Sequence, residues 1–555
     1  MTPRQEWTSA PVLALGLISG IALIAGWQLF WFVCDDAYIA FRYVHNLVFG
    51  NGLVWNAAPF APVEGYSSLL WVVLLGAVWT LTGVEPPVSS QWLGLGFGLG
   101  SLALVIRFGL RLPLSERMQG TRLLILGLVL FGTISNRTFL AWTSSGLEQG
   151  MFSFLLLAWL SVCVSCIARD RWAWALTGIA ALLELTRPDG LLFVAMTGLM
   201  LILWLADRAR AQRLRLRDFA PMLPLAVPVA HVGWRFAYYG ELLPNTYYAK
   251  TVAAWPEAGL RYVMSFALEY AYVLWIPVAI AAGLRAWQRR RKSEKKVHER
   301  PIAQTLLHAL PIATLLLHFG YYTFFVGGDT FEYRIYHHWV PLLMLLLPWL
   351  LDQAGFSARP ALAYAATSIA LGLVLPWAHW SQTRQLVTLH EAGLPHYRIA
   401  KHFPEPIRGW PESFDQLQGW LIKQRGIGLR HQTHKLFTTQ VQWQRFPTRA
   451  EGLRVVSDAN PIMLHRAVGY PGWALPGIAI LDGLGLNDRV IARNPVRARL
   501  RRMAHERSPP AGYIECFRPN VFAEGGEVII NARSSPLTDR DIQDCEARFA
   551  EQTHD

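Results

Sequence analysis

The chain has 555 residues, of which 53% are hydrophobic and only 16% are charged, and it contains 24 tryptophans. Its apolar residues gather into long uncharged runs that a soluble core would not need, so the composition excludes an ordinary soluble protein and indicates a polytopic membrane protein. The formal net charge of +13 does not indicate nucleic-acid binding, because the basic residues lie in short segments between apolar runs.

We read eleven apolar runs as transmembrane helices. The first, residues 11–34, contains no charge and exceeds the roughly 20 residues that cross a bilayer core. We expect a span here and not a cleaved signal peptide, because the run is too long for an h-region and no small-residue cleavage site follows. The other ten runs are 89–110, 123–140, 151–168, 172–187, 190–206, 219–238, 260–284, 302–326, 338–351 and 360–380.

One further apolar stretch, residues 69–82, is only 14 residues long. With eleven spans, the loops on the N-terminal side of the membrane hold 20 lysines and arginines, whereas the loops on the other side hold four. A full crossing at 69–82 would reverse this bias, and basic loops are normally cytoplasmic. We therefore expect a re-entrant or interfacial helix at 69–82, a cytoplasmic N-terminus and an extracytoplasmic C-terminus.

The chain is predicted to divide into two parts at about residue 380. Residues 1–380 form an all-α membrane domain with a first outer loop at 35–88, which starts with an amphipathic helix ended by Gly50 and Gly52. Residues 381–555 contain no span, and we expect a soluble α+β or β-rich extracytoplasmic domain, for which glycan binding is one role to test. Its expected strands include 453–456, 478–481 and 527–531. Cys516 and Cys545 can form a disulfide if this domain lies in an oxidising compartment.

Polar residues cluster at the mouths of the spans, and with this topology all the clusters lie on the outer side. Because so many carboxylates, arginines and tyrosines at a membrane boundary are not needed merely to link helices, their convergence predicts one cavity at the outer membrane surface. The six clusters are Asp35-Asp36, 63–67 with Glu64 and Tyr66, 144–148 with Glu148, 185–190 with Arg187 and Asp189, 238–250 with Asn245 and Lys250, and 327–334 with Asp329, Glu332 and Arg334.

This set of side chains suits a lipid-linked sugar phosphate whose tail lies in the bilayer. Arg187, Arg334 and Lys250 are candidates to bind the donor phosphate. A carboxylate within reach of the acceptor hydroxyl would act as general base, and Asp35 or Asp36 fits that role. The candidate sugar-binding and acceptor-binding residues are Glu64, Tyr66, Glu148, Asp189, Asn245 and Asp329.

Adjacent residues on a helix point about 100° apart, so we expect only one of Asp35 and Asp36 to face the cavity. Asp36 can serve instead as the N-cap of the following helix, which makes Asp35 the narrow first choice. No cofactor is certain. A divalent cation held by Asp35, Asp36, Glu64 and Asp329 is one alternative for the same carboxylates.

Several of these residues also have plain structural explanations. Arg187 can end a helix while pairing with Asp189, Asp329 can cap a turn, and Glu148 can pair with a neighbouring arginine. The His337-His338 pair at a span mouth is read as an interface pair and not as a metal site. His431 and His434 form a weak HxxH motif without a third ligand nearby.

The ordered set of motifs resembles GT-C fold glycosyltransferases. It resembles more closely the terminal β-(1→2)-arabinofuranosyltransferases of actinobacterial cell-wall synthesis. The residues that carry the resemblance are DDAY at the end of the first span, FRYVHNLVFGNGLVWN, EGYSSLLW, SSGLEQG, LTRPDG, YYGELLPNTYYAK, VGGDTFEYR, LDGLGLNDRVIAR and AHER. VGGDTFEYR departs from the family where an aromatic residue is expected after the aspartate, and about the last 50 residues show no resemblance.

The resemblance implies an enzyme of the bacterial cytoplasmic membrane that transfers arabinofuranose from a polyprenyl-phosphate donor to a cell-envelope glycan. It implies that Asp35 or Asp36 is the catalytic carboxylate. Three rival functions stay open: a GT-C transferase that adds another lipid-linked sugar, such as mannose or glucose, to lipopolysaccharide or protein; a lipid-linked sugar transporter; and a non-catalytic glycan-binding protein. A transporter would be expected to have internal repeats and mid-membrane charges; we find no repeat, although Arg137 and Arg235 lie within expected spans.

Overall fold

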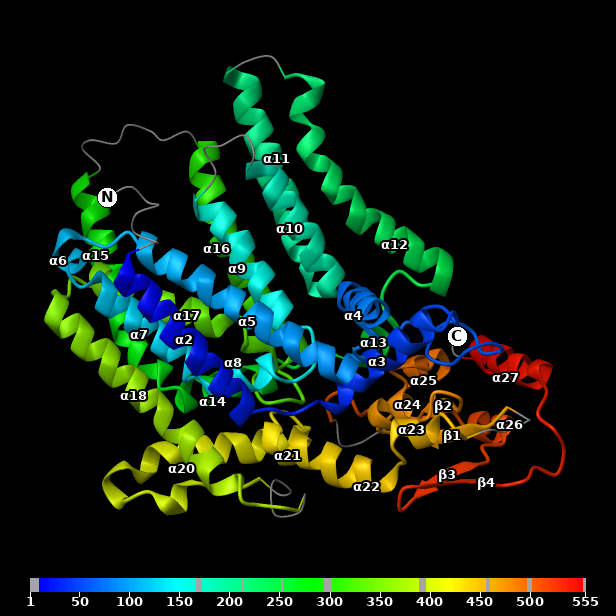
Figure 1. Cartoon of the computed structure of the whole chain (residues 1–555). Helices are drawn as coiled ribbons and strands as arrows, with labels where there is room; N and C mark the ends of the chain where they lie inside the picture. The colour runs from blue at the N-terminus through cyan, green and yellow to red at the C-terminus, as the bar shows by residue number, and fades with distance from the viewer. Residues whose placement is uncertain are drawn as a thin grey trace.

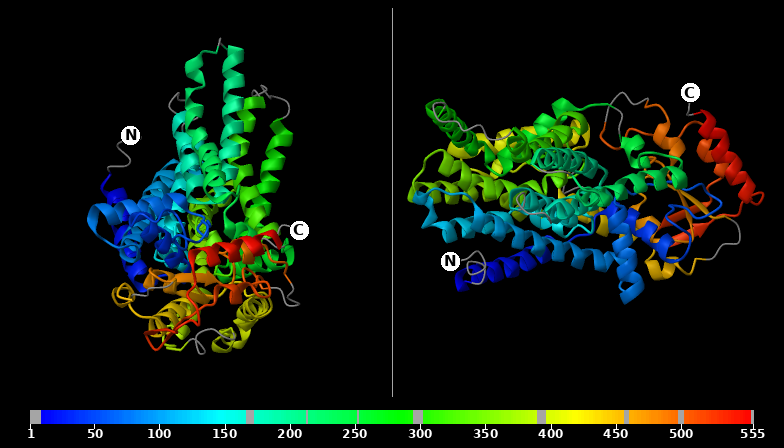
Figure 2. Two further views of the ribbon diagram at one scale, coloured as in Figure 1. Left: turned by 90° about the vertical axis from the view of Figure 1, so that its right-hand side faces the viewer. Right: turned by 90° about the horizontal axis from the view of Figure 1, so that it is seen from above.

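The computed structural model describes residues 9–165, 172–211, 214–250, 253–293, 302–388, 396–455, 460–496 and 502–552. Most of these residues lie in helices (Figure 1). Two further views show the long helices on one side of the molecule and the C-terminal part across their ends (Figure 2). The chain therefore forms a helical bundle, with its C-terminal part lying across one end of the helices.

Each predicted span contains at least one helix. These are α2 (Ala10–Leu29), α5 (Pro86–Arg111), α7 (Arg122–Ile134) with α8 (Arg137–Thr143), α9 (Gln149–Ser165), α10 (Trp172–Thr186), α11 (Leu191–Ala211), α12 (Ala226–Tyr239), α14 (Pro256–Glu269) with α15 (Trp275–Ser293), α16 (Ile302–Gly320), α17 (Trp339–Gln353) and α18 (Ala358–Thr383). Short helices between them are α6 (Glu116–Gln119), α13 (Asn245–Lys250), and the 3-10 or π-helical turns Pro188–Gly190, Leu216–Asp218, Ala220–Leu225, Tyr272–Leu274, Tyr321–Val326 and Arg334–Tyr336.

Length and composition separate these helices into groups. Among the described residues, five helices are long and apolar enough to cross a membrane alone, or up to seven if each of two bent pairs counts as one span. The bent pairs are α7–α8, at 59°, and α14–α15, at 89°. Four more apolar helices are only 10–17 residues long. The structure thus supports a membrane domain, and the count of eleven crossings stays a prediction.

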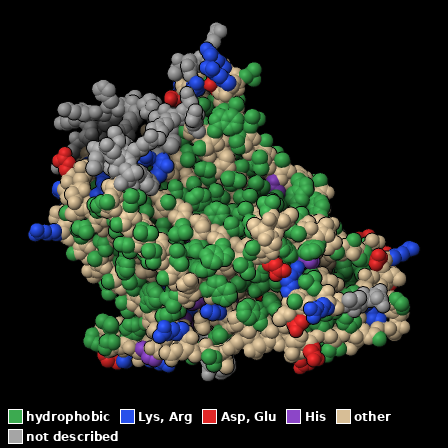
Figure 3. Space-filling model, viewed as in Figure 1, with side chains coloured by type: hydrophobic (Ala, Val, Ile, Leu, Met, Phe, Trp, Pro, Cys, Tyr) green, Lys and Arg blue, Asp and Glu red, His purple; other side chains and the backbone are tan. Residues whose placement is uncertain are grey.

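The surface matches a membrane domain. Apolar side chains point outward from the long helices, with Leu17 on α2, Ile202 on α11 and Leu316 on α16 each more than half exposed. In Figure 3, hydrophobic side chains cover much of the middle of the visible face, and basic side chains appear at the tip above it. Such exposed apolar surface is costly in water and suits contact with lipid.

The short helix α4 (Leu69–Thr82) has the bounds predicted from the sequence. It ends at Gly83, whose φ of 75° places it in the left-handed region that glycine adopts without strain. One face of α4, including Trp71 and Leu75, is buried. That α4 is a separate helix is confirmed, and its position in the membrane stays a prediction.

Helix α3 (Asp35–Val48) follows the first long helix. Cys34 is its N-cap, so the interpretation of Asp36 as the N-cap is wrong; Asp35 and Asp36 both lie in the first turn. Carboxylates there interact favourably with the positive end of the helix dipole. Residues 37–46 are all buried, so the middle of α3 is enclosed on every side, whereas Asp35 and Asp36 at its start are only partly buried.

The C-terminal part combines helices with two small sheets. Strands β1 (Ile462–His465) and β2 (Ala479–Asp482) pair in parallel, and β3 (Val521–Glu524) pairs antiparallel with β4 (Glu527–Ile530). Its helices are α20 (Glu405–Trp420), α21 (His431–Leu436), α22 (Trp443–Arg445), α23 (Arg449–Gly452), α24 (Gly469–Ala474), α25 (Arg489–Arg493), α26 (Tyr513–Phe517) and α27 (Asp539–Gln552), with 3-10 or π-helical segments at Ala400–His402, Leu421–Arg425 and Phe437–Gln442.

Two of the three strands expected there are confirmed, at 478–481 and 527–531. The expected strand at 453–456 is wrong over its first residues, because Leu453 and Arg454 form a turn that follows α23; residue 456 lies outside the described residues. Cys516 on α26 and Cys545 on α27 form a disulfide, which settles the pairing that the sequence left open. We keep the name soluble domain for this C-terminal part, after the sequence-based prediction, which stays a prediction. Its residues share one hydrophobic core with the helical bundle, as Trp473 and Trp71 show.

Candidate active site

Asp35 and Asp36 face different surroundings. The Asp36 carboxylate lies 3.5 Å from Nη1 of Arg334, and 32% of its side chain is exposed. Oδ1 of Asp35 instead accepts a hydrogen bond of 3.0 Å from the backbone N–H of Tyr470 in the soluble domain. Loss of hydration under this contact raises the pKa of Asp35 to about 7. Asp36 is therefore a partly exposed carboxylate beside a cation, whereas Asp35 is hydrogen-bonded to the soluble domain.

Arg334 is held from its other side by Asp329. Its Nε and Nη2 donate to the two carboxylate oxygens of Asp329 at 2.7 and 3.0 Å, and its guanidinium lies 4.4 Å from the ring centre of Phe331. A bidentate pair of this kind fixes the plane of the guanidinium. The Nη1 edge consequently points toward Asp36 and stays available to a further anion.

The loop that carries Asp329 and Arg334 is attached to the soluble domain through main-chain hydrogen bonds. Gly428 N–H donates to Asp329 O, Leu429 N–H donates to Thr330 O, and Glu332 N–H donates to Leu429 O, each at 2.9 Å. At the next residue, Tyr333 has a φ of 46°, in the left-handed region that side chains rarely adopt. This reversal lets Glu332 point into the protein while Arg334 turns back toward Asp36.

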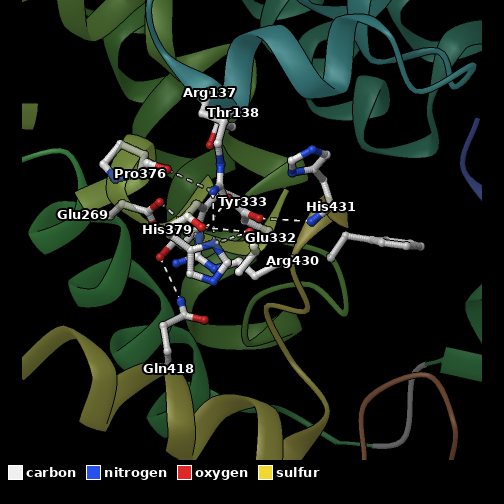
Figure 4. A network of polar contacts seen from close by, with 12 residues as sticks. Arg137, Thr138, Glu269, Glu332, Tyr333, Pro376, His379, Gln418, Arg430 and His431 are labelled. Atoms are coloured by element: carbon white, nitrogen blue, oxygen red, sulfur yellow. Dashed lines mark hydrogen bonds and ion pairs between the residues drawn. The ribbon is translucent and has the colours of Figure 1, made fainter. Parts of the chain in front are cut away.

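Beneath this loop lies a buried ion-pair network that joins the two domains (Figure 4). Glu332 pairs with Arg137 of α8 and, at 2.8 Å, with Arg430 of the soluble domain, which also binds both oxygens of Glu269 on α14. All four side chains are at most 3% exposed. Arg137 is therefore balanced within a two-arginine, two-glutamate set that locks the soluble domain in place.

Arg187, which follows α10, forms a second cluster of polar contacts. It donates to Glu148 at 2.8 Å, to Asp189 at 3.0 Å and to the Tyr322 hydroxyl at 2.8 Å. His318 also contacts Asp189, at 2.9 Å. The pairing of Arg187 with Asp189 and the pairing of Glu148 with an arginine, both given as structural explanations from the sequence, are thus confirmed. The Arg187 side chain is still 17% exposed.

A third group is deeply buried. Glu64, 1% exposed, accepts from Nε of Arg235 at 2.6 Å, and burial raises its pKa even though Arg235 opposes the shift. The hydroxyls of Tyr66 and Tyr239 lie 3.3 Å apart, with Tyr66 3% exposed. Arg235, which lies within an expected span, therefore has its charge paired with that of Glu64.

Two further candidates lie near the soluble domain. Asn245 donates to the carbonyls of Gly485 and Leu486 at 2.8 and 3.0 Å, so it clamps the loop within the LDGLGLND motif. Lys250 is exposed at the last residue of α13. The structure brings Asp36, Asp329 and Arg334 together, while Glu64, Tyr66 and Asn245 have structural contacts.

No group of three or more histidine, cysteine, aspartate or glutamate side chains able to hold a metal ion occurs among the described residues. The four carboxylates considered for a cation do not share one position, because Asp329 and Asp36 lie beside Arg334 while Glu64 is paired with Arg235. His337 and His338, read from the sequence as an interface pair, are both buried inside the protein.

Two residues of the soluble domain lie at the site although the sequence analysis did not assign them to it. His434 lies with its ring centre 4.2 Å from that of Phe331, and burial lowers its pKa to about 4, so its imidazole is neutral at pH 7. The HxxH pattern was its only signal. Nothing in the sequence indicated Tyr470, because its contact with Asp35 joins residues far apart in the chain.

The fold and the site define a largely helical protein with several apolar helices that suit a membrane, and with a carboxylate–arginine site at the start of α3. Two curated proteins resemble the chain, and both are named terminal β-(1→2)-arabinofuranosyltransferase. The protein from Mycobacterium tuberculosis is 33% identical over 300 residues, which are 50% of this chain and 44% of the relative. The protein from Corynebacterium glutamicum is 29% identical over 378 residues, 62% of this chain and 51% of the relative.

The resemblance inferred from the motifs is thus confirmed. The chain spans about half the length of these curated relatives. No family model matches the chain, and no solved structure matches it significantly.

Proposed function

We propose that the protein is a glycosyltransferase that moves arabinofuranose from a polyprenyl-phosphate donor to a cell-envelope glycan or glycoconjugate on the outer face of the cytoplasmic membrane. The observation that carries the proposal is the grouping of Asp36, Arg334 and Asp329 in a chain similar to two arabinofuranosyltransferases. A general base and a phosphate-binding cation are the two groups that such a transfer needs most.

The proposed step uses the two ends of this site. Asp36 takes the proton of the acceptor hydroxyl as that oxygen bonds to the anomeric carbon of the donor sugar. The bond from the anomeric carbon to the phosphate oxygen breaks, and the departing polyprenyl phosphate gains negative charge. Nη1 of Arg334 is placed to stabilise that charge, because Asp329 already occupies Nε and Nη2.

We assign Asp36 and not Asp35 as the base. The sequence preference for Asp35 rested on an N-cap role for Asp36, and Cys34 is the N-cap. The Asp36 side chain is 32% exposed and lies beside the proposed phosphate site, whereas Asp35 is engaged by Tyr470. The partly exposed cluster of Arg187, Glu148 and Asp189 is the best further candidate to bind sugar hydroxyls.

Three features support the proposed location and the lipid-linked donor. The basic loops favour a cytoplasmic N-terminus, so that α3 and the soluble domain lie outside. The disulfide between Cys516 and Cys545 suits an oxidising compartment. The exposed apolar helices suit a donor whose lipid tail stays in the bilayer.

The test is a transfer assay with the purified full chain in detergent or vesicles. Polyprenyl-phosphate arabinofuranose, mannose and glucose are each offered with an arabinofuranosyl oligosaccharide acceptor. We expect product from the arabinofuranose donor alone. Transfer from the mannose or glucose donor alone would assign a different sugar, and no transfer from any donor by the intact protein would overturn the proposal.

A further inference from the structure

We propose that Trp443 and Tyr470 form an acceptor subsite on the soluble domain, a platform on which a neutral glycan chain stacks as its end enters the site at Asp36. The proposal rests on the proposed function and names the surface that selects the acceptor. Its basis is an exposed aromatic side chain that leads, through a second aromatic ring, to the carboxylate pair.

Trp443 is unusual for its position. It lies in the soluble domain and 41% of it is exposed, although it is the largest kind of apolar side chain. It stands at the start of α22, directly after the π-helical segment Phe437–Gln442. π-Helical turns inside helices are rare and often occur at functional sites, because they re-aim the side chains that follow.

Tyr470 links Trp443 to the site. The ring centres of Trp443 and Tyr470 are 6.3 Å apart, and those of Tyr470 and Tyr38 are 5.3 Å apart. The backbone N–H of Tyr470 holds Asp35, the neighbour of Asp36 on α3. The half-buried Tyr470 ring therefore lies between the exposed indole and the first turn of α3.

The helical run that carries Trp443 also reaches the site at its other end. It begins at His431, and its residue His434 packs on Phe331, which in turn stacks with Arg334. Trp443 lies nine positions after His434, which corresponds to roughly 13 Å along a helix. In Figure 1, α21 and α22 follow one another along the lower side of the molecule, with α24 and α3 above α22. The spacing suits a short oligosaccharide lying along the run.

The chemistry of this surface favours carbohydrate. The apolar C–H faces of a sugar stack on indole and phenol rings, while its hydroxyls need polar partners at the rim. Exposed Gln444 and Arg445 flank Trp443, and Thr439 and Gln440 are half-buried on the preceding turn. A rigid aromatic ring with an adaptable polar rim gives orientation at low entropic cost.

The first test measures binding without transfer. Saturation-transfer NMR on the full chain in detergent would use an arabinofuranosyl oligosaccharide and a mannosyl oligosaccharide as probes. We expect the arabinofuranosyl signal to fall at least several-fold in Trp443→Ala and to be kept in Trp443→Phe. The control Phe522→Ala removes another exposed aromatic ring of the same domain, 53% exposed on β3, and should change nothing.

The second test separates binding from chemistry. In the transfer assay, Trp443→Ala should raise the acceptor KM about tenfold, as expected for truncating an aromatic anchor, with kcat and the donor KM unchanged. Unaltered glycan binding and acceptor KM in Trp443→Ala would overturn the inference, as would a loss confined to kcat. A protein that binds the probe through Trp443 but transfers no sugar would disprove the proposed function while leaving this subsite standing.

Discussion

Nη1 of Arg334 approaches the carboxylate of Asp36 to 3.5 Å, and it does so from a loop that the soluble domain holds in place. This distance is long for an ion pair. The other two guanidinium nitrogens of Arg334, Nε and Nη2, donate to Asp329. A donor phosphate that binds Nη1 would compete with Asp36 for this edge of the fixed guanidinium and leave the carboxylate free to accept a proton. On the proposed function, this relationship would connect donor binding with activation of the acceptor.

Replacing Arg334 should weaken the use of donor. Arg334→Lys keeps the charge but cannot reproduce the two-pronged bond to Asp329, so kcat/KM for the donor should fall by about 10- to 100-fold, the loss of a charge-assisted hydrogen bond worth about 1.5–3 kcal/mol. Asp329→Asn should act in the same direction with a smaller effect. Initial rates at varied donor concentration measure both. A change confined to the acceptor KM would contradict the assignment.

The buried network should dominate the attachment of the soluble domain. Glu332→Gln leaves Arg137 and Arg430 with a neutral partner in a dry site, and we expect it to lower the free energy of unfolding by about 3–5 kcal/mol. Denaturant unfolding in detergent measures the loss. The control Arg408→Ala removes an exposed pair with Glu405 and should cost less than about 1 kcal/mol. Equal losses in the two variants would show that the network contributes little.

Asp35 should make stability depend on pH. Its pKa is raised from 3.8 to about 7, so between these values the folded protein binds a proton that the unfolded chain has lost. The stability that this proton contributes is complete below about pH 4 and declines as the pH rises to about 7. Asp35→Asn should therefore match the wild type at acidic pH and exceed its thermal midpoint at about pH 8. Parallel pH profiles for the two proteins would rule out this role.

Removing the disulfide should loosen the end of the soluble domain. The bond closes a segment between residues 29 positions apart, and Cys516→Ser with Cys545→Ser should cost about 2–4 kcal/mol in unfolding free energy. Thermal unfolding measures the cost. Thiol alkylation before and after reduction reports the bond itself, since the two described free cysteines, Cys34 and Cys163, are buried. Complete alkylation of both cysteines without reductant would show that no bond forms in the membrane.

Local chemistry explains what the sequence predicted well. The bounds of α4 follow from an apolar run bounded by Ser68 and Gly83, and the end of α3 follows from Gly50. The contact of Arg187 with Asp189 was foreseeable because the two residues are only two apart. Each of these features depends on neighbouring residues alone.

The contacts of the site could not be predicted from neighbouring residues. Asp36 meets Arg334, Asp35 meets Tyr470, and Glu332 meets Arg430 only after the soluble domain folds back over the helices. Sequence spacing carries no information on such contacts. It also could not show that Glu64 and Tyr66, which looked like sugar ligands, are buried among their own partners.

The most direct test of the account compares Asp36→Asn with Asp35→Asn in arabinofuranose transfer from the polyprenyl-phosphate donor. Asparagine keeps the shape of the side chain but cannot accept the proton. We predict that Asp36→Asn lowers kcat by about 100- to 10,000-fold with an unchanged fold, as expected for loss of a general base, while Asp35→Asn keeps most of the activity. Full activity in Asp36→Asn, or loss of activity in Asp35→Asn alone, would contradict it.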